Sequence, residues 1–207
     1  MPGPIVILSD LHLGRPRHSA RSAESLRPLW QGAWRLVLNG DVAEVHHPHH
    51  WAQAARHVMR LFDLCESDDV ELTLLSGNHD PFLSDFRHLH LADREIFVTH
   101  GDAMHPAIAP WSPAGARMRE AHEVALASLT ARDRDALHAR LEAAQHAGYA
   151  EWADAEQVLR EEAAHSSLRG MLIRPWALIR VIRYWRAFPD LAAQFAAEHA
   201  PAARFII

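Results

Sequence analysis

Residues 71–80, Glu-Leu-Thr-Leu-Leu-Ser-Gly-Asn-His-Asp, join a short apolar run directly to polar groups that can bind a metal. Leucine- and threonine-rich residues 71–75 favour a β-strand, because such side chains suit a pleated, largely buried surface. Gly77 then allows a sharp turn of the backbone. The amide of Asn78, the imidazole of His79 and the carboxylate of Asp80 follow at once. This stretch therefore predicts a strand whose carboxyl end carries a functional loop.

The same arrangement occurs three more times in the first half of the chain. The apolar runs Ile5–Leu8, Leu36–Leu38 and Ile96–Thr99 are followed by Asp10-Leu11-His12, Asn39-Gly40-Asp41 and His100-Gly101-Asp102. Between two of these runs, residues 51–65 carry apolar side chains at helical spacing. Alternating strands and helices predict an α/β domain with a buried sheet. Because ligand sites in such sheets form at the carboxyl ends of strands, we expect the four loops to converge.

These loops have the composition of a site for two cations. Asp10 and His12 lie two residues apart at a strand end, so their side chains leave the same face and can hold one ion. Asp41 has two carboxylate oxygens and can bridge two ions. Imidazole, carboxylate and amide ligands without thiolate suit Mn²⁺, Fe or Zn²⁺. Two cations about 3.5–4 Å apart can stabilise both the attacking and the leaving oxygen of a displacement at phosphorus.

The ordered motif series resembles that of the calcineurin-like metallophosphoesterases. The matching segments are Asp10-Leu11-His12, Gly40-Asp41-x-x-Glu44, Gly77-Asn78-His79-Asp80 and His100-Gly101-Asp102. The resemblance covers residues 5–105. It implies an α/β fold with a β-sandwich core flanked by helices and a helical insertion after the His-Gly-Asp motif. It also implies hydrolysis of a phosphodiester, phosphomonoester or pyrophosphate bond by a hydroxide that bridges two metals.

Carried over position by position, the resemblance implies a ligand set for two divalent cations. Asp10 and His12 would bind the first cation, and Asp41 would bridge the pair. Asn78 and His100 would bind the second cation. Mn²⁺ is the expected metal, with Fe or Zn²⁺ as alternatives.

The resemblance also implies roles for residues around the ligands. His79 would stabilise the transition state or protonate the leaving oxygen. Glu44 stands where some family members carry a residue that orients this histidine, and the alternative is a solvent-facing acid. Asp80 would fix a histidine tautomer or serve only as a loop acid.

One family motif, Gly-His-x-His after a late strand, is not found in this sequence. Residues 201–207 resemble the strand that precedes that motif, and the sequence stops there. We therefore expect a shortened chain. The alternative function is a catalytically impaired binding or scaffold protein of the same fold that lacks the last two ligand histidines.

The second half of the chain has a different composition. Residues 106–200 are rich in Ala, Glu and Arg, which predicts a helical insertion or lid within one metallophosphoesterase domain spanning residues 1–207. Thr130 is expected to begin a helix that ends at His146, shortly before Gly148. A second helix is expected to begin at Pro175 and to end at Phe188, because Pro189 follows.

The segment Leu168–Phe188 combines apolar residues with Arg180, Arg183 and Arg186 along one flank. It is either an amphipathic helix packed on the core, or a lid whose arginines bind substrate phosphate or lipid headgroups. An insertion at this place is similar to that of UDP-2,3-diacylglucosamine pyrophosphatases. Those proteins carry Arg where His79 stands here, so their substrate is not transferred.

Composition narrows the choice of partner and compartment. The net charge of −5 gives no general attraction to nucleic acid, so we expect a small phosphate-containing substrate such as a nucleotide or lipid conjugate. A peripheral membrane contact stays open. The single Cys65 excludes an internal disulfide, and no secretion signal or long apolar run is present, so a cytoplasmic location is expected. The histidine-rich residues 46–50 are expected to form an exposed loop.

Overall fold

The computed structural model describes residues 3–15, 22–105, 108–109, 112, 114–154, 159 and 175–207. The chain forms two compact units. The first unit comprises residues 1–91, 98–100 and 207, and the second comprises residues 92–97 and 101–206. Helices and strands occur in both, which confirms the mixed α/β class. The prediction of a single domain stays a prediction.

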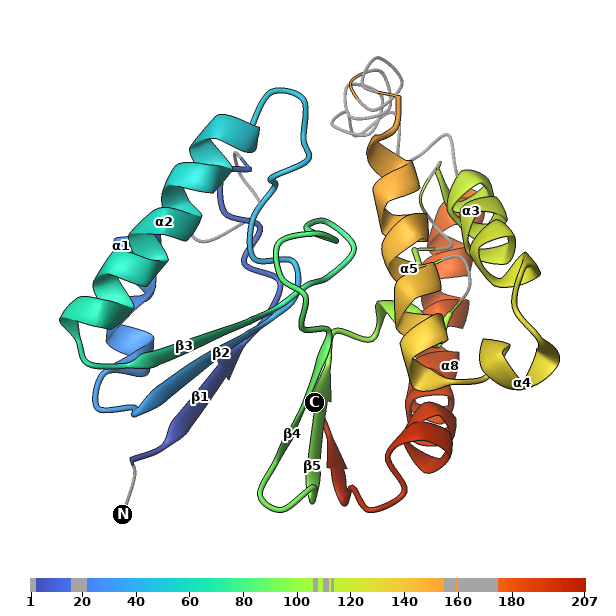
Figure 1. The fold of residues 1–207 in the computed structure, drawn as a ribbon. Helices are drawn as coiled ribbons and strands as arrows, with labels where there is room; N and C mark the ends of the chain where they lie inside the picture. Colours follow the sequence, from blue (N-terminus) through green and yellow to red (C-terminus); the bar gives the residue numbers. More distant parts are fainter. Residues whose placement is uncertain are drawn as a thin grey trace. The chain divides into compact units, whose positions relative to one another are not determined.

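A parallel sheet forms the centre of the first unit. Its strands β1 (Ile5–Leu8), β2 (Arg35–Asn39) and β3 (Glu71–Leu75) lie in that order, and Figure 1 shows their arrowheads at the same end. Ile5 pairs with Arg35, which in turn pairs with Glu71. The three strands predicted from their apolar runs are confirmed. Parallel pairing places the loops that follow these strands at one edge of the sheet.

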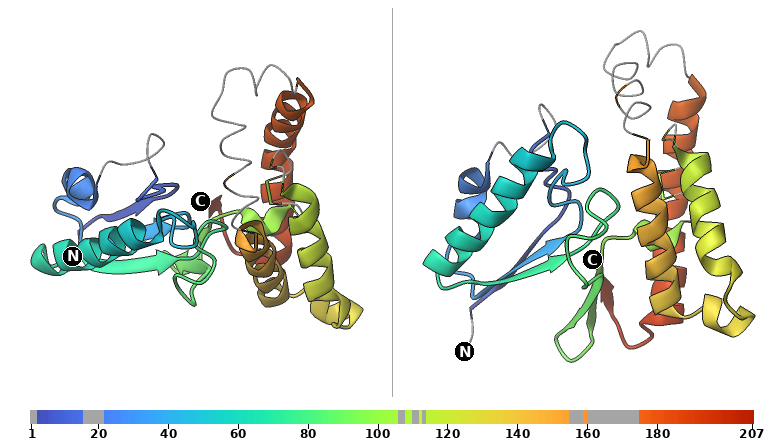
Figure 2. Two further views of the ribbon diagram at one scale, coloured as in Figure 1. Left: turned by 90° about the horizontal axis from the view of Figure 1, so that it is seen from above. Right: turned by 45° about the horizontal axis from the view of Figure 1, so that its top comes forward.

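Helical segments cover one face of this sheet (Figures 1 and 2). They are α1 (Ala23–Leu26), the 3₁₀ helix η1 (Arg27–Trp30) and α2 (Trp51–Ser67). The helix expected from apolar spacing over residues 51–65 is confirmed: its buried residues are Ala54, Val58, Leu61, Leu64 and Cys65. They pack with Leu36 and Leu38 of β2 and with Trp30. Burial raises the pKa of the Cys65 thiol to about 11, as suits a core residue.

A second sheet contains β4 (His88–Leu91), β5 (Ile96–Thr99) and β6 (Phe205–Ile206), in that order. Ile96 pairs in parallel with Phe205, so the strand expected near the end of the sequence is confirmed. The strand β4 was not predicted, because two histidines in four residues give a weak apolar signal. Packing of the two sheets as a β-sandwich stays a prediction.

Three long helices form most of the described second unit: α3 (Gly115–Ala127), α5 (Leu137–Trp152) and α8 (Pro175–His199), visible in Figures 1 and 2. The shorter η2 (Asp102–Met104) and α4 (Ala131–Arg134) accompany them. Buried side chains from the long helices meet in one cluster that includes Met118, Leu141 and Phe195. No described helix is both long enough and apolar enough to cross a membrane.

Two predicted helix ends in this unit are wrong. Thr130 does cap a helix, because its side chain accepts a hydrogen bond from the Asp133 N–H, but that helix is the short α4. The next helix, α5, continues past His146 and through Gly148 to Trp152. Gly148 is buried, so tight packing of this face offsets the helix penalty of glycine, about 1 kcal/mol.

The helix α8 likewise continues through Pro189, where it was expected to end. Beyond the proline, Leu191, Ala192 and Phe195 pack into the core of the second unit. Burial of these side chains outweighs the cost of an interior proline, about 3 kcal/mol.

For the described part of residues 168–188, one side of the helix packs on the protein and the other is exposed. Residues 168–174 lie outside the described residues. Leu178 is 63% exposed and Trp185 is 59% exposed, so this turn of α8 faces solvent with both its apolar and its basic side chains. On the packed side, Val181 and Tyr184 are half-buried, the Tyr184 ring lies 5.7 Å from that of His105, and Phe188 borders the buried cluster.

Replacing the interior proline should stabilise the protein. Pro189→Ala restores a backbone donor inside α8 and removes the clash of the ring with the preceding turn. We expect a gain of about 1–2 kcal/mol, because greater freedom of the unfolded chain offsets part of the benefit. Thermal unfolding followed by circular dichroism measures it. Pro201→Ala, in the exposed turn after α8, is the control and should not raise the melting temperature. An unchanged or lower value for Pro189→Ala would contradict this account.

Candidate metal centre

The four predicted loops converge in the first unit, at the carboxyl ends of the strands. Two groups of side chains bring their ligand atoms within 4.8 Å of one another. One group contains His12, Asp41 and His79, and the other contains Asp10, Asp41 and His100. Asp41 belongs to both, as expected of a bridging ligand. The convergence predicted from parallel strand order is confirmed, and so is a composition able to hold metal ions.

Asp41 occupies the centre of this arrangement and is only 4% exposed. Its Oδ1 atom accepts the backbone N–H of His79 at 2.8 Å and lies 3.3 Å from His100 Nε2. Its Oδ2 atom lies 3.9 Å from His12 Nε2 and 4.0 Å from His79 Nε2. Burial opposes ionisation, but the three imidazoles outweigh it and lower the pKa of Asp41 well below its usual range. The group is therefore a carboxylate that attracts positive charge.

His100 is fixed in the tautomer that a metal ligand needs. Its Nδ1 lies 3.0 Å from the Asn39 carbonyl oxygen, which can only accept, so Nδ1 carries the hydrogen. The Nε2 lone pair then faces Asp41 Oδ1 and Asn78 Oδ1, each 3.3 Å away. Three acceptor atoms that face one another repel unless a proton or a metal cation lies among them. The donor set thus fits a divalent metal ion.

Glu44 is completely buried, so the solvent-facing alternative is wrong. Its Oε2 lies 3.1 Å from His79 Nδ1, the contact that the resemblance implies. Its Oε1 lies 2.9 Å from His12 Nδ1 and 3.5 Å from the Arg15 guanidinium. Burial opposes ionisation of Glu44, but His79, His12 and Arg15 outweigh it and lower its pKa. Sequence reasoning missed the bond to His12, because the two residues are far apart in the chain.

Asp80 links two loops through their backbones. Its Oδ1 accepts the N–H groups of Asp41 at 3.1 Å and Gly77 at 2.8 Å. Its Oδ2 accepts those of Val42 at 2.6 Å and Ala43 at 3.3 Å. These bonds of Asp80 go to backbone N–H groups and not to a histidine, so it is a loop acid that holds the Asp41 loop. Burial and the adjacent Asp41 carboxylate raise the pKa of Asp80 to about 6, against the lowering effect of its backbone donors.

Backbone strain is concentrated in the same loops. Asp10, His12 and Asp41 have φ values of 54°, 46° and 51°, in the left-handed region that costs a residue other than glycine about 1–3 kcal/mol. Two hydrogen bonds between the loops hold this conformation: Asp10 N–H to the Gly40 carbonyl at 3.2 Å and His12 N–H to the Asp41 carbonyl at 2.9 Å. Three candidate ligands are thus kept in a costly geometry by their surroundings, as is typical of functional sites.

Other predicted residues lie outside this centre. Arg180 and Arg183 are exposed on α8 in the second unit, and their role in substrate binding stays a prediction. The loop of residues 46–50 is not fully exposed as expected: His47 is 1% exposed and its ring stacks on His50 at 4.2 Å. Burial of His47 could not be predicted from a row of polar residues.

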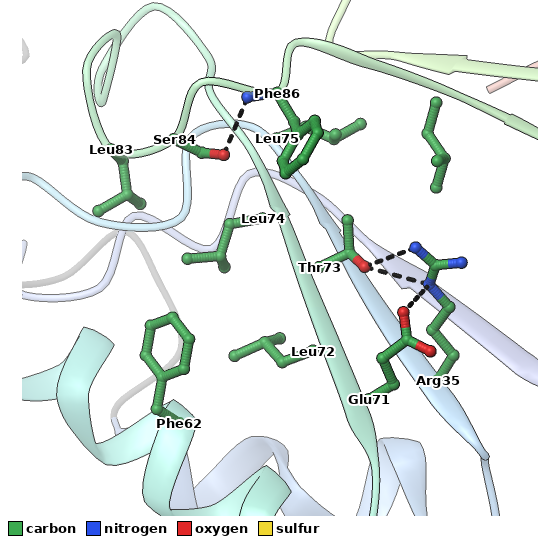
Figure 3. A pocket seen from close by; sticks show the side chains of 11 residues that line it. Arg35, Phe62, Glu71, Leu72, Thr73, Leu74, Leu75, Leu83, Ser84 and Phe86 are labelled. Atoms are coloured by element: carbon green, nitrogen blue, oxygen red, sulfur yellow. Dashed lines mark hydrogen bonds and ion pairs between the residues drawn. The ribbon is translucent and has the colours of Figure 1, made fainter.

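A separate pocket of about 440 Å³ lies along β3 (Figure 3). Leucines and Phe62 and Phe86 make up most of its lining. Its arginine, Arg35, is bonded to Thr73 at 2.8 Å and to Glu71 at 3.3 Å, so these polar groups satisfy one another. None of the metal-centre residues lines this pocket. The candidate metal ligands therefore lie in the loop cluster and not in this pocket.

Comparison with known proteins gives no match to a protein family, to a curated protein or to a solved structure.

Gly77 should be essential for the metal centre. A Cβ atom at this position would overlap the Asp41 carboxylate and backbone N, whereas Gly77 itself has no positive φ that would penalise alanine. We expect Gly77→Ala to weaken Mn²⁺ binding at least about tenfold, since displaced ligands typically cost that much. Isothermal titration calorimetry measures the affinity.

Gly32→Ala provides the matched control for this substitution. Gly32 has φ +77° with open space around it, so alanine there should lower the melting temperature without changing Mn²⁺ affinity. Equal Mn²⁺ affinity of Gly77→Ala and the unmodified protein would show that Asp41 can shift without consequence for binding.

Proposed function

We propose that this chain is a metal-dependent phosphoesterase of the metallophosphoesterase type, acting on a phosphodiester, phosphomonoester or pyrophosphate bond. The observation that supports this most directly is the buried Asp41 carboxylate, whose two oxygens each face a separate set of ligand atoms. A carboxylate shared in this way suits two neighbouring cations. The finer fold assignment, a β-sandwich core with a helical insertion, is part of the same proposal.

Residues on both sides of Asp41 can hold a cation. Asp10, Asn78 and His100 offer oxygen and nitrogen atoms on one side, and His12 lies on the other. When bound, such a metal pair neutralises charge at phosphorus and makes water acidic enough to attack at neutral pH. Mn²⁺ is the metal we propose first, because carboxylate, amide and imidazole donors all suit it.

The protein groups supply orientation around that pair. The Asn39 carbonyl fixes His100, and the Glu44 carboxylate fixes His12 at 2.9 Å. Asp80 holds the backbone next to Asp41. A site fixed in this way loses little free energy to reorganisation when charge develops on the phosphoryl oxygens. The substrate we propose is a small phosphate compound, because a net charge of −5 gives no general attraction to a nucleic acid.

Hydrolysis of bis-p-nitrophenyl phosphate tests the proposal. We expect Mn²⁺-dependent release of p-nitrophenol, abolished by EDTA and restored by added metal. Asp41→Asn should lower kcat/KM at least about 100-fold, because the amide removes the shared negative charge. The measurement is the absorbance of p-nitrophenolate over a Mn²⁺ titration.

Asp69→Asn is the control for charge and backbone. Asp69 is exposed and also has a positive φ, a conformation that asparagine tolerates. The activity of the Asp69→Asn variant should therefore match that of the unmodified protein. Cation binding without turnover of this substrate, of p-nitrophenyl phosphate or of a pyrophosphate would favour the catalytically impaired binding protein. Turnover unaffected by Asp41→Asn would refute the proposed centre.

A further inference from the structure

Glu44 holds two imidazole rings in equivalent positions. Its Oε1 binds His12 Nδ1 at 2.9 Å and its Oε2 binds His79 Nδ1 at 3.1 Å. The two rings stand edge to face, with centroids 4.7 Å apart and planes at 90°. The carboxylate is fully buried, so these bonds are shielded from water and define both ring positions.

This pairing sets the tautomer of both rings. An ionised carboxylate only accepts hydrogen bonds, so both Nδ1 atoms donate, and the Nε2 atom of each neutral ring carries a lone pair. Each Nε2 is directed at the same oxygen of Asp41, at 3.9 Å from His12 and at 4.0 Å from His79. Both histidines therefore have the same tautomer, are bonded through Nδ1 to Glu44, and direct Nε2 at Asp41 Oδ2.

His79 is also anchored through its backbone. Its N–H donates to Asp41 Oδ1 at 2.8 Å, while its side chain is held by Glu44. The residue is thus fixed at both ends against the carboxylate that the two ligand groups share. Such fixation is what a metal ligand requires, since metal-binding histidines characteristically donate their other ring N–H to a carboxylate or carbonyl group.

We propose that His79 is itself a metal ligand, and that Asp41, His12 and His79 form a three-ligand cation site positioned by Glu44. This inference rests on the proposed function and changes one part of it, because the resemblance gives His79 a role at the transition state. A tetrahedral ion with bonds of about 2.1 Å holds its ligand atoms about 3.4 Å apart. An inward movement of about half an ångström by each ring therefore closes the site and leaves one position for water or a phosphate oxygen.

The two halves of the centre then differ in their chemistry. Two imidazoles and one carboxylate suit Zn²⁺ or Fe²⁺, whereas the oxygen-rich group of Asp10, Asp41 and Asn78 with His100 suits Mn²⁺. Glu44 acts only through the imidazoles in this scheme and is a positioning residue. A carboxylate partner also makes each imidazole a stronger donor to the ion.

Titration with Co²⁺ tests whether His79 binds metal. The metal-free protein should take up two Co²⁺ ions, with visible absorption from an imidazole-rich, four- or five-coordinate ion. His79→Ala should take up one ion tightly and lose that absorption. His79→Gln, which preserves the size of the side chain, should do the same, and circular dichroism in EDTA establishes that both variants are folded. His49→Ala removes an exposed histidine of the neighbouring loop and should leave both ions in place.

Glu44→Gln provides an independent measurement. The amide can accept from only one imidazole, so we expect Co²⁺ affinity in this half to fall about 10–100-fold while the stoichiometry at saturating metal stays at two. A variant that loses activity but not metal would contradict a role through ligand position.

The outcomes separate the two proposals. Two tightly bound Co²⁺ ions with an unchanged spectrum in both His79 variants would overturn the ligand assignment and leave the phosphoesterase proposal intact. An unmodified protein that binds no Co²⁺ or Mn²⁺ would overturn the metal centre itself. One ion in the His79 variants against two in the unmodified protein supports the assignment.

Discussion

A carboxylate removed from water must be stabilised by nearby positive charge or by hydrogen-bond donors, and Asp41 is such a group at the end of β2. Its exposed fraction is 4%, and its surroundings comprise three imidazoles and the N–H of His79. In neutral tautomers anchored through Nδ1, His79 and His100 present lone pairs to this carboxylate. That arrangement is favourable only when a cation lies between these atoms, either the proton of an imidazolium or a metal ion, so the electrostatics of Asp41 suit a metal site.

Precise placement of Asp41 depends on loops that are costly to form. Asp10, His12 and Asp41 adopt positive φ values, and the site lies against Gly40 and Gly77, where any side chain would overlap His100 or Asp41. The Asp80 carboxylate accepts backbone N–H groups from both the Asp41 and the Gly77 loop, which compensates part of that cost. Because these bonds involve only protein atoms, the geometry is set by the fold and does not have to be created by a metal ion.

Local patterns predicted the elements and the meeting of the loops, because strand runs and parallel connections follow short-range rules. They did not predict the Glu44–His12 bond or the role of Asp80, since both depend on how separate loops pack in space. The same limit explains the errors at Gly148 and Pro189. Each residue is a valid local stop signal, yet burial of neighbouring side chains in the second unit contributes more free energy than the signal costs. A local sequence pattern carries no information about such tertiary contacts.

The carboxyl groups of the centre make it attractive to cations. Four carboxyl groups belong to it: Asp10, Asp41, Glu44 and Asp80. Burial and the adjacent Asp41 charge raise the pKa of Asp80 to about 6, against the lowering effect of its backbone donors, so negative charge is concentrated in these loops. The Arg15 guanidinium, 3.5 Å from Glu44 Oε1, compensates one of these charges, and a divalent cation held at Asp41 would compensate two more. In the proposed function, a cation bound there would stabilise the negative charge that develops on a phosphate, which the carboxylates alone would repel.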